Sequence, residues 1–182
     1  MYILGINAYH ADSSAAIFKD GEMIAATEEE RFTRVKHWAG FPVQAIQFCL
    51  READISLNEV DYITIGRDTK AKLFNKMAYL FRNPTLIAGA FSRYKNARQV
   101  TSLEDEFHKI DPSVNFESIR SKIRNIEHHR SHLASAFFAS PFEEAALLSI
   151  DGSGDFTTTM IGIGRGNKIE VLDSVDFPVS CG

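Results

Sequence analysis

Three histidines gather in one short stretch, at His128, His129 and His132. The alanine, leucine and phenylalanine spacing after them predicts a helix, in which residues four apart share one face. His128 and His132 would then present two imidazoles side by side, which is how a helix supplies two ligands to one metal ion. His129 would point elsewhere and is a candidate either for supporting the metal ligands from behind or for contact with a substrate. The alternative for all three is a role in capping the helix or on its surface.

A metal site also needs a carboxylate, and Asp151 is the best candidate. Asp151 follows an apolar run that reads as a strand, and it precedes the turn Gly152-Ser153-Gly154. A strand fixes a carboxylate at its tip, while glycines let backbone N–H groups approach a phosphate. Gly152, Ser153 and Gly154 are therefore candidates for binding a nucleotide phosphate. A plain hairpin turn is the alternative, because Asp-Gly is also a common turn sequence.

A polar loop near the N-terminus, at residues 7–14, is the second candidate region. Its small and hydroxylated residues suit contacts with a phosphate or a carbonyl group, and Asn7 and Asp12 are its candidates for substrate binding. Because histidine side chains can change charge near neutral pH, His10 could accept a proton as a general base. By itself the loop could equally be a solvated hairpin connection. Two strand–loop–strand units, one early and one late, are typical of a duplicated nucleotide-binding core.

A charge-rich segment follows at residues 28–37. Most such runs are solvated connections between elements. The functional alternative is that Arg34, Lys36 and His37 face an anionic or hydroxyl-rich ligand beside the first loop.

The segments that must position these side chains alternate between strand and helix patterns. Apolar runs bounded by turn residues predict strands at residues 2–6, 15–18, 23–27, 61–66, 145–150, 157–164 and 168–175. The Asp20-Gly21 pair predicts a tight hairpin turn between the second and third of these. Helical patterns follow Pro42 to about Asp54 and cover residues 67–103 and 112–124. Together they predict an α/β core with a mixed β-sheet flanked by helices and a helical insertion at about residues 67–125.

The insertion is basic at its start. Residues 67–103 contain eight Lys and Arg against one acid, Asp68, so this stretch carries +7 and the rest of the chain −11. A solvated helical face is the ordinary explanation, and docking of a partner, an anionic substrate or RNA is the alternative.

The composition of the chain excludes several classes of protein. The chain has 182 residues, 45% of them hydrophobic and 24% charged, with a net charge of −4. This composition excludes a disordered, collagen-like or disulfide-built chain, and the mild acidity makes nucleic acid an unfavoured partner. No apolar run approaches the ~20 residues of a membrane span, and two cysteines make no disulfide framework. We therefore expect a cytoplasmic protein without a membrane partner.

Four motifs together resemble the O-carbamoyltransferase family, which includes the nodulation-factor, cephalosporin and tobramycin carbamoyltransferases. They lie at residues 4–16, 29–37, 128–132 and 150–154, in the family's order. The resemblance implies one lobe of an actin/Hsp70/sugar-kinase-like, ribonuclease H-like fold. It implies that residues 1–182 are the N-terminal half of the large transferase domain, so that the C-terminal lobe and the carbamoyladenylate-forming domain lie outside this chain. The chain alone would then not be a complete enzyme.

The resemblance also implies the reaction and its participants. The family makes carbamoyladenylate from carbamoyl phosphate and ATP and transfers the carbamoyl group to a hydroxyl of a small molecule or sugar. His128, His132 and Asp151 match the residues that bind a divalent metal, usually iron, with zinc or manganese as alternatives. Gly152 to Gly154 match the turn at the nucleotide phosphates. His10 and Asp12 match the loop near the carbamoyl group, and the resemblance leaves room for a dimer.

Two other functions fit the same fold class. One is an ATP- and magnesium-dependent phosphotransferase lobe, which would use an acidic metal site and give the histidine pair no role. The other is a binding or regulatory module without catalytic activity, for which the basic stretch would be the docking surface.

Overall fold

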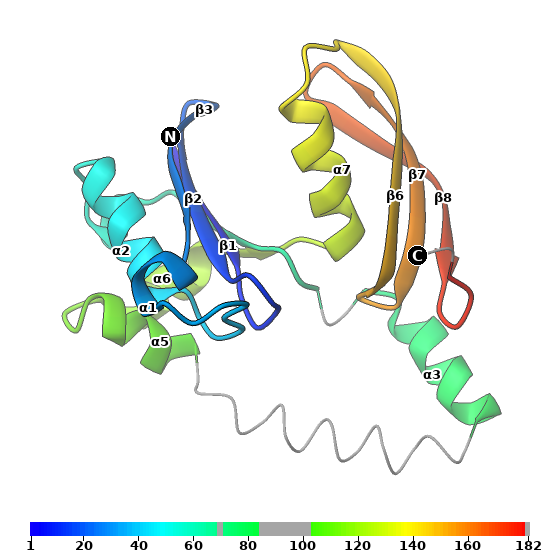
Figure 1. Cartoon of the computed structure of the whole chain (residues 1–182), viewed down its shortest axis with the longest axis horizontal. Helices are drawn as coiled ribbons and strands as arrows, with labels where there is room; N and C mark the ends of the chain where they lie inside the picture. The colour runs from blue at the N-terminus through cyan, green and yellow to red at the C-terminus, as the bar shows by residue number, and fades with distance from the viewer. Residues whose placement is uncertain (69–70, 84–102, 181–182) are drawn as a thin grey trace. The chain divides into compact units, whose positions relative to one another are not determined.

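A computed structural model describes residues 1–68, 71–83 and 103–180 (Figure 1). The described residues form two compact units, which we treat separately. The first unit holds residues 1–66 and 103–125, and the second holds residues 67–68, 71–83 and 126–180. Within these residues no helix combines the length and the apolar character that a membrane crossing requires.

The first unit is built on a five-stranded mixed sheet in the order β3-β2-β1-β4-β5. Its strands are β1 (Tyr2–Asn7), β2 (Ser14–Lys19), β3 (Glu22–Glu28), β4 (Tyr62–Ile65) and β5 (Ile123–Asn125). The first three are antiparallel neighbours, whereas β4 runs parallel to β1 and β5 parallel to β4. The predicted α/β class and mixed sheet are confirmed. The predicted hairpin turn is also present, with φ of 52° at Asp20 and 93° at Gly21.

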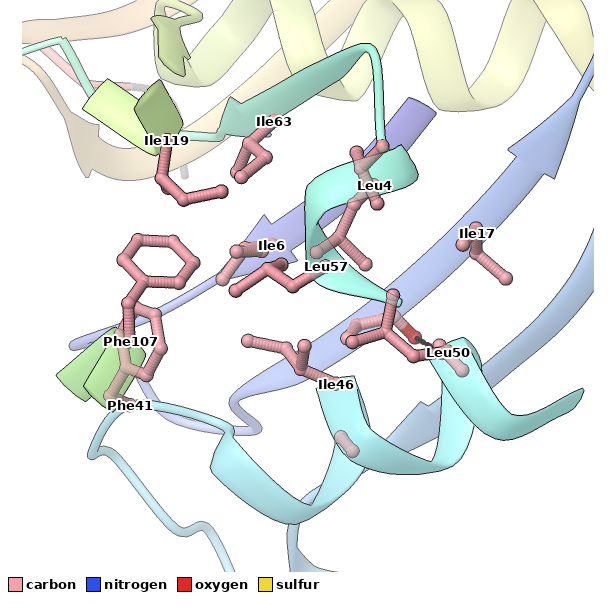
Figure 2. Close-up of a cluster of buried hydrophobic side chains, with 14 of the residues drawn as sticks. Leu4, Ile6, Ile17, Phe41, Ile46, Leu50, Leu57, Ile63, Phe107 and Ile119 are labelled. Atoms are coloured by element: carbon pink, nitrogen blue, oxygen red, sulfur yellow. Dashed lines mark hydrogen bonds between the residues drawn. The ribbon is translucent and has the colours of Figure 1, made fainter. Parts of the chain in front are cut away.

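Alternating side chains on the strands of the first unit create its core (Figure 2). Leu4 and Ile6 point from β1 to the same side as Ile17 from β2 and are buried there. The amphipathic helix α2 (Val43–Glu52) covers this side and buries Ala45, Ile46, Cys49 and Leu50. Two short elements, α1 (Glu30–Thr33) and the 3-10 turn η1 (Leu57–Glu59), complete the connections.

Residues 103–125 are an integral part of this core. Helix α5 (Leu103–Ile110) and helix α6 (Phe116–Lys122) insert Phe107 and Ile119 among the buried side chains, and both residues are fully buried. The predicted helix over 112–124 is wrong at both ends, because α6 starts after Asn115 and the chain becomes strand β5 at Ile123. Ile123 pairs with Ile63 of β4, so sheet pairing overrides the helical pattern. Residues 84–102 of the predicted basic helical stretch lie outside the described residues.

The second unit contains a separate three-stranded antiparallel sheet in the order β6-β7-β8. Its elements are α3 (Leu73–Arg82), α7 (His128–Phe138), β6 (Glu144–Gly154), β7 (Thr157–Arg165) and β8 (Lys168–Asp176). Helix α7 lies along one face of the sheet (Figure 1), where Leu133 and Phe137 pack against Leu147 and Met160. Asp176 holds helix α3 in place. Its carboxylate contacts the ammonium group of Lys72, the residue just before the helix, and accepts a hydrogen bond from the Asn75 side-chain amide. The sequence predicted the three strands but did not separate them from the mixed sheet.

Candidate functional site

The second unit brings His128, His132 and Asp151 together. His128 Nε2 lies 3.0 Å from Asp151 Oδ2 and 3.0 Å from His132 Nε2, and His132 Nε2 lies 3.7 Å from Asp151 Oδ2. One ligand atom from each residue lies within 4.8 Å of the other two. The histidines stand four residues apart at the start of α7, and Asp151 lies on β6. The three side chains can therefore contact one ion.

The chemistry of these three groups fits a divalent transition metal. Burial and the neighbouring His128 lower the pKa of His132, which favours the neutral imidazole that binds metals. Partial burial acts to raise the pKa of Asp151, but hydrogen bonds from the Gly152 backbone N–H and from His128 outweigh it, so the net pKa is lowered. Two imidazoles and a carboxylate suit iron, zinc or manganese. Three protein ligands also leave coordination positions open, as catalytic sites require.

Backbone hydrogen bonds fix the first turn of α7, where His128 begins the helix. Glu127 accepts a hydrogen bond from the Arg130 N–H at 2.8 Å and caps the helix. Asp155 Oδ2 accepts one from the His128 N–H at 3.1 Å and another from the Asp68 N–H at 2.7 Å. Asp155 was not among the predicted site residues, although its place at the end of Asp-Gly-Ser-Gly-Asp was an available signal. Asp155 orients the helix end from which His128 projects.

Asp155→Ala is expected to loosen this helix end and to weaken metal binding. The variant leaves two N–H groups without their acceptor, which costs about 1–3 kcal/mol, and it frees the His128 backbone to shift. Isothermal titration with Zn²⁺ or Mn²⁺ measures the affinity, and Glu170→Ala, an exposed change on β8, is the control. Equal affinities for the two variants would contradict the expectation.

Gly154 makes room for the imidazole of His128. A Cβ atom at position 154 would lie 2.0 Å from Cδ2 and 2.4 Å from Cγ of His128. No atom lies within 4 Å of the corresponding position at Gly152. Gly154 therefore has a steric role that the phosphate-binding prediction did not include. The side chain of Ser153 lies outside the described structure.

His129 is a buried structural residue, so the prediction that it contacts substrate is wrong. It is fully buried, its Nε2 donates to the Thr157 carbonyl at 2.9 Å, and its Nδ1 lies 2.8 Å from Ser149 Oγ. A carbonyl only accepts, so Nε2 carries the proton and Nδ1 accepts from the Ser149 hydroxyl. His129 thereby ties α7 to β6 and β7. Its spacing to Leu133 and Phe137, four and eight residues on, is the signal that places it on the buried face.

In the first unit, two loops at residues 8–13 and 34–40 are joined by hydrogen bonds. The Tyr9 N–H donates to the Gly40 carbonyl at 3.2 Å, and the Ser13 N–H donates to the Trp38 carbonyl at 3.0 Å. The Ser13 hydroxyl also donates to the Gly40 carbonyl at 2.7 Å. These bonds place two predicted candidates side by side, because Asp12 Oδ1 lies 2.8 Å from His37 Nδ1.

The other first-unit candidates have different surroundings. Asn7 donates a hydrogen bond to the Asp12 carbonyl at 3.2 Å, within its own loop. One ring nitrogen of His10, Nε2, is buried. Arg34 and Lys36 are exposed, and among the described residues no carboxylate forms an ion pair with either. They remain available to an anionic ligand.

Glu29, in the same charged segment, is a structural residue. Its carboxylate is buried and accepts hydrogen bonds from the Ala45 N–H at 2.7 Å and the Gln44 N–H at 3.1 Å. These are donors of the first turn of α2, so Glu29 satisfies the helix N-terminus. The segment is therefore divided between a buried helix-capping residue and exposed cations.

Comparison with known proteins identifies the family of the chain. A family model described as "Carbamoyltransferase N-terminus" matches residues 2–182. The chain is 41% identical to protein sll1178 of Synechocystis, over 100% of this chain and 30% of that protein. It is 33% identical to nodulation protein NolNO of Sinorhizobium fredii, over 96% of this chain and 24% of that protein. The chain thus spans less than a third of the length of these relatives.

The solved structures that resemble the chain are more distant. They include YeaZ from Pseudomonas aeruginosa, with a TM-score of 0.42 and 15% identity over 100% of this chain and 72% of that one. A Ppx/GppA phosphatase of Aquifex aeolicus has a TM-score of 0.36 and 14% identity over 99% of this chain and 53% of that one. The family match over nearly all residues confirms the resemblance carried by the four motifs. The chain belongs to the family described as the carbamoyltransferase N-terminus.

Proposed function

We propose that this chain is the N-terminal part of an ATP-dependent O-carbamoyltransferase that moves a carbamoyl group from carbamoyladenylate to a hydroxyl of a small molecule or sugar. The observation that carries the proposal is the His128, His132 and Asp151 cluster in a chain of this family. The family model described as "Carbamoyltransferase N-terminus", which matches residues 2–182, supports the reaction class. We further propose the actin/Hsp70/sugar-kinase type of fold, a C-terminal lobe and an adenylate-forming domain outside these residues, and a cytoplasmic location.

The chemistry follows from the charge changes in such a transfer. Carbamoyladenylate is a mixed anhydride, and negative charge grows on the AMP phosphate as the bond to the carbamoyl carbon breaks. A divalent cation, when bound, supplies the positive charge that offsets this growth. His128 and His132 would hold it as neutral imidazoles and Asp151 as a carboxylate. The backbone at Gly152 to Gly154 would face the phosphate, and Arg34 and Lys36 would attract an anionic or hydroxyl-rich ligand.

The acceptor hydroxyl must also lose its proton. We propose His10, on the loop of the family's first motif, as the base for this step.

His128→Ala and His132→Ala are expected to lower bound metal and carbamoyl transfer together. Each removes one of three ligands, and a two-ligand remainder holds a transition metal weakly. Elemental analysis of the naturally produced protein gives the metal stoichiometry, and carbamate formation gives the transfer rate. His108→Gln, which removes an imidazole bonded to the Val114 carbonyl in the first unit, is the control.

Two outcomes would count against the proposal. Unchanged metal stoichiometry in both histidine variants would remove the metal assignment. Binding of Mg²⁺ alone, with phosphate rather than carbamate appearing on the acceptor, would favour the phosphotransferase alternative.

A further inference from the structure

Helix α3 presents its apolar side to the solvent. Leu73, Phe74, Met77 and Phe81 recur at helical spacing, so they share one side of the helix, which we call the apolar stripe. Their side chains are 50%, 87%, 47% and 78% exposed, respectively. No residue of α3 is buried. A contiguous exposed apolar surface of this kind marks a place where the protein binds something.

The opposite side of α3 attaches the helix to its own unit (Figure 1). Asn75 Nδ2 donates a hydrogen bond to Asp176 Oδ2 at 2.6 Å. The ring of Tyr79 lies beside the rings of Phe156 and Phe177, at centroid distances of 5.8 and 5.5 Å. Because these contacts fix which side of the helix faces the unit, the apolar stripe is directed away from it.

Cations flank the apolar stripe on both sides. Lys76 follows Leu73 by three residues on one border, and Arg82 follows Ala78 by four residues on the other. Helix α3 contains no acidic residue, and the surrounding sequence at residues 67–103 carries +7. The partner that complements this surface must therefore be apolar and negatively charged at once.

An anionic lipid surface meets both requirements. Apolar side chains between two cations are typical of a helix that lies in the interface of a bilayer, where the apolar groups enter the acyl region and the cations reach the headgroups. A second copy of this chain would instead bring another +7 stretch against the first, and like charges repel. Such a contact is not a membrane span, because α3 has 10 residues.

We propose that α3 is a peripheral membrane-binding helix, with its apolar stripe inserted at the surface of an anionic bilayer and Lys76 and Arg82 at the headgroups. This interaction goes beyond carbamoyl transfer and does not depend on it. It departs from our expectation of no membrane partner, which followed from the lack of long apolar runs. That criterion detects spans and does not detect helices that lie on the surface.

Vesicle sedimentation with the full-length protein, as it is naturally produced, tests the proposal. Vesicles of equal parts phosphatidylglycerol and phosphatidylcholine are the anionic probe, and vesicles of phosphatidylcholine alone are the neutral one. We expect the protein to sediment with the anionic vesicles and much less with the neutral ones. Added salt should release it, because salt screens exposed charges.

The main variant combines Phe74→Ala with Phe81→Ala. It removes the two most exposed rings of the apolar stripe and is expected to lower the partition coefficient by at least about 10-fold. Both side chains are exposed, so the urea unfolding curve should not change. Arg82→Gln is expected to lower the affinity for anionic vesicles by about 5-fold, the usual effect of one cation at such a surface.

The matched control combines Phe138→Ala with Phe142→Ala. These side chains are 56% and 65% exposed and belong to the same unit, but they lie outside α3. The control therefore removes two exposed rings and leaves the apolar stripe intact. It should bind anionic vesicles as the wild-type protein does.

Three results would overturn the proposal. They are no sedimentation with anionic vesicles, equal binding by the wild-type protein and the α3 double variant, and an equal loss in the control. Without vesicle binding, a dimer that the α3 double variant splits in sedimentation velocity would assign the apolar stripe to a second copy. Without vesicle binding, a monomer whose α3 amides resist hydrogen exchange would assign it to another part of the full-length protein.

Discussion

Gly154→Ala is expected to lower the affinity for a divalent metal at His128, His132 and Asp151 by about 10–100-fold, the range seen when the support of a metal ligand is lost. The new methyl group would lie 2.0 Å from Cδ2 and 2.9 Å from Cβ of His128. Because the contact reaches Cβ, rotation of the imidazole alone cannot relieve it. His128 must move away, and its Nε2 then leaves Asp151, now 3.0 Å distant.

Gly152→Ala is the matched control for this change. It lies in the same turn, no atom lies within 4 Å of its Cβ position, and its φ is not in the left-handed region. Zn²⁺ and Mn²⁺ titration of both variants measures the affinity. A loss of the same size in Gly152→Ala would mean that glycine flexibility in the turn, and not space for His128, controls the metal site.

Phe107→Ala is expected to destabilise the first unit by about 3–5 kcal/mol, the usual cost of removing a buried phenylalanine. Phe107 is fully buried, and its ring lies beside that of Phe41 (Figure 2), at a centroid distance of 5.4 Å. The ring of Phe116 lies at a centroid distance of 6.2 Å. The single tryptophan of the chain, Trp38, belongs to the first unit, so its fluorescence during urea unfolding reports this loss.

The control for Phe107 is Phe74→Ala on α3, where the side chain is 87% exposed. Its truncation should change the free energy of unfolding of the first unit very little. If Phe107→Ala proved equally mild, helix α5 would be a peripheral insertion and not part of the core.

Local rules predicted much of the fold and the grouping of His128, His132 and Asp151. Alternating apolar residues and the Asp20-Gly21 turn were enough for the β1-β2-β3 hairpins, because both signals act over a few residues. The spacing of His128 and His132 on one helix, with Asp151 on a strand, was enough to propose three residues that the structure brings together.

Pairings between distant segments could not be predicted in the same way. Strand β5 has three residues and pairs in parallel with β4 across a long connection, so no periodicity reveals it. The contact between Asp12 and His37 depends on how Ser13 and Tyr9 bond to the facing loop. His129 is buried because it shares one face of α7 with Leu133 and Phe137. The prediction missed this pattern because three clustered histidines suggested a chemical role instead.

The polar contacts that hold His128, His132 and Asp151 together come almost entirely from one continuous stretch of chain. Glu127, which caps α7, and Thr157, which binds His129, mark its ends, and Asp151 and Asp155 lie between them. Closing loops this short costs little chain entropy, and contacts of low sequence separation form early in folding. The ligands are therefore positioned by neighbours along the chain. The site can mature as one helix–hairpin unit, ahead of the slower parallel pairing that completes the sheet of the first unit.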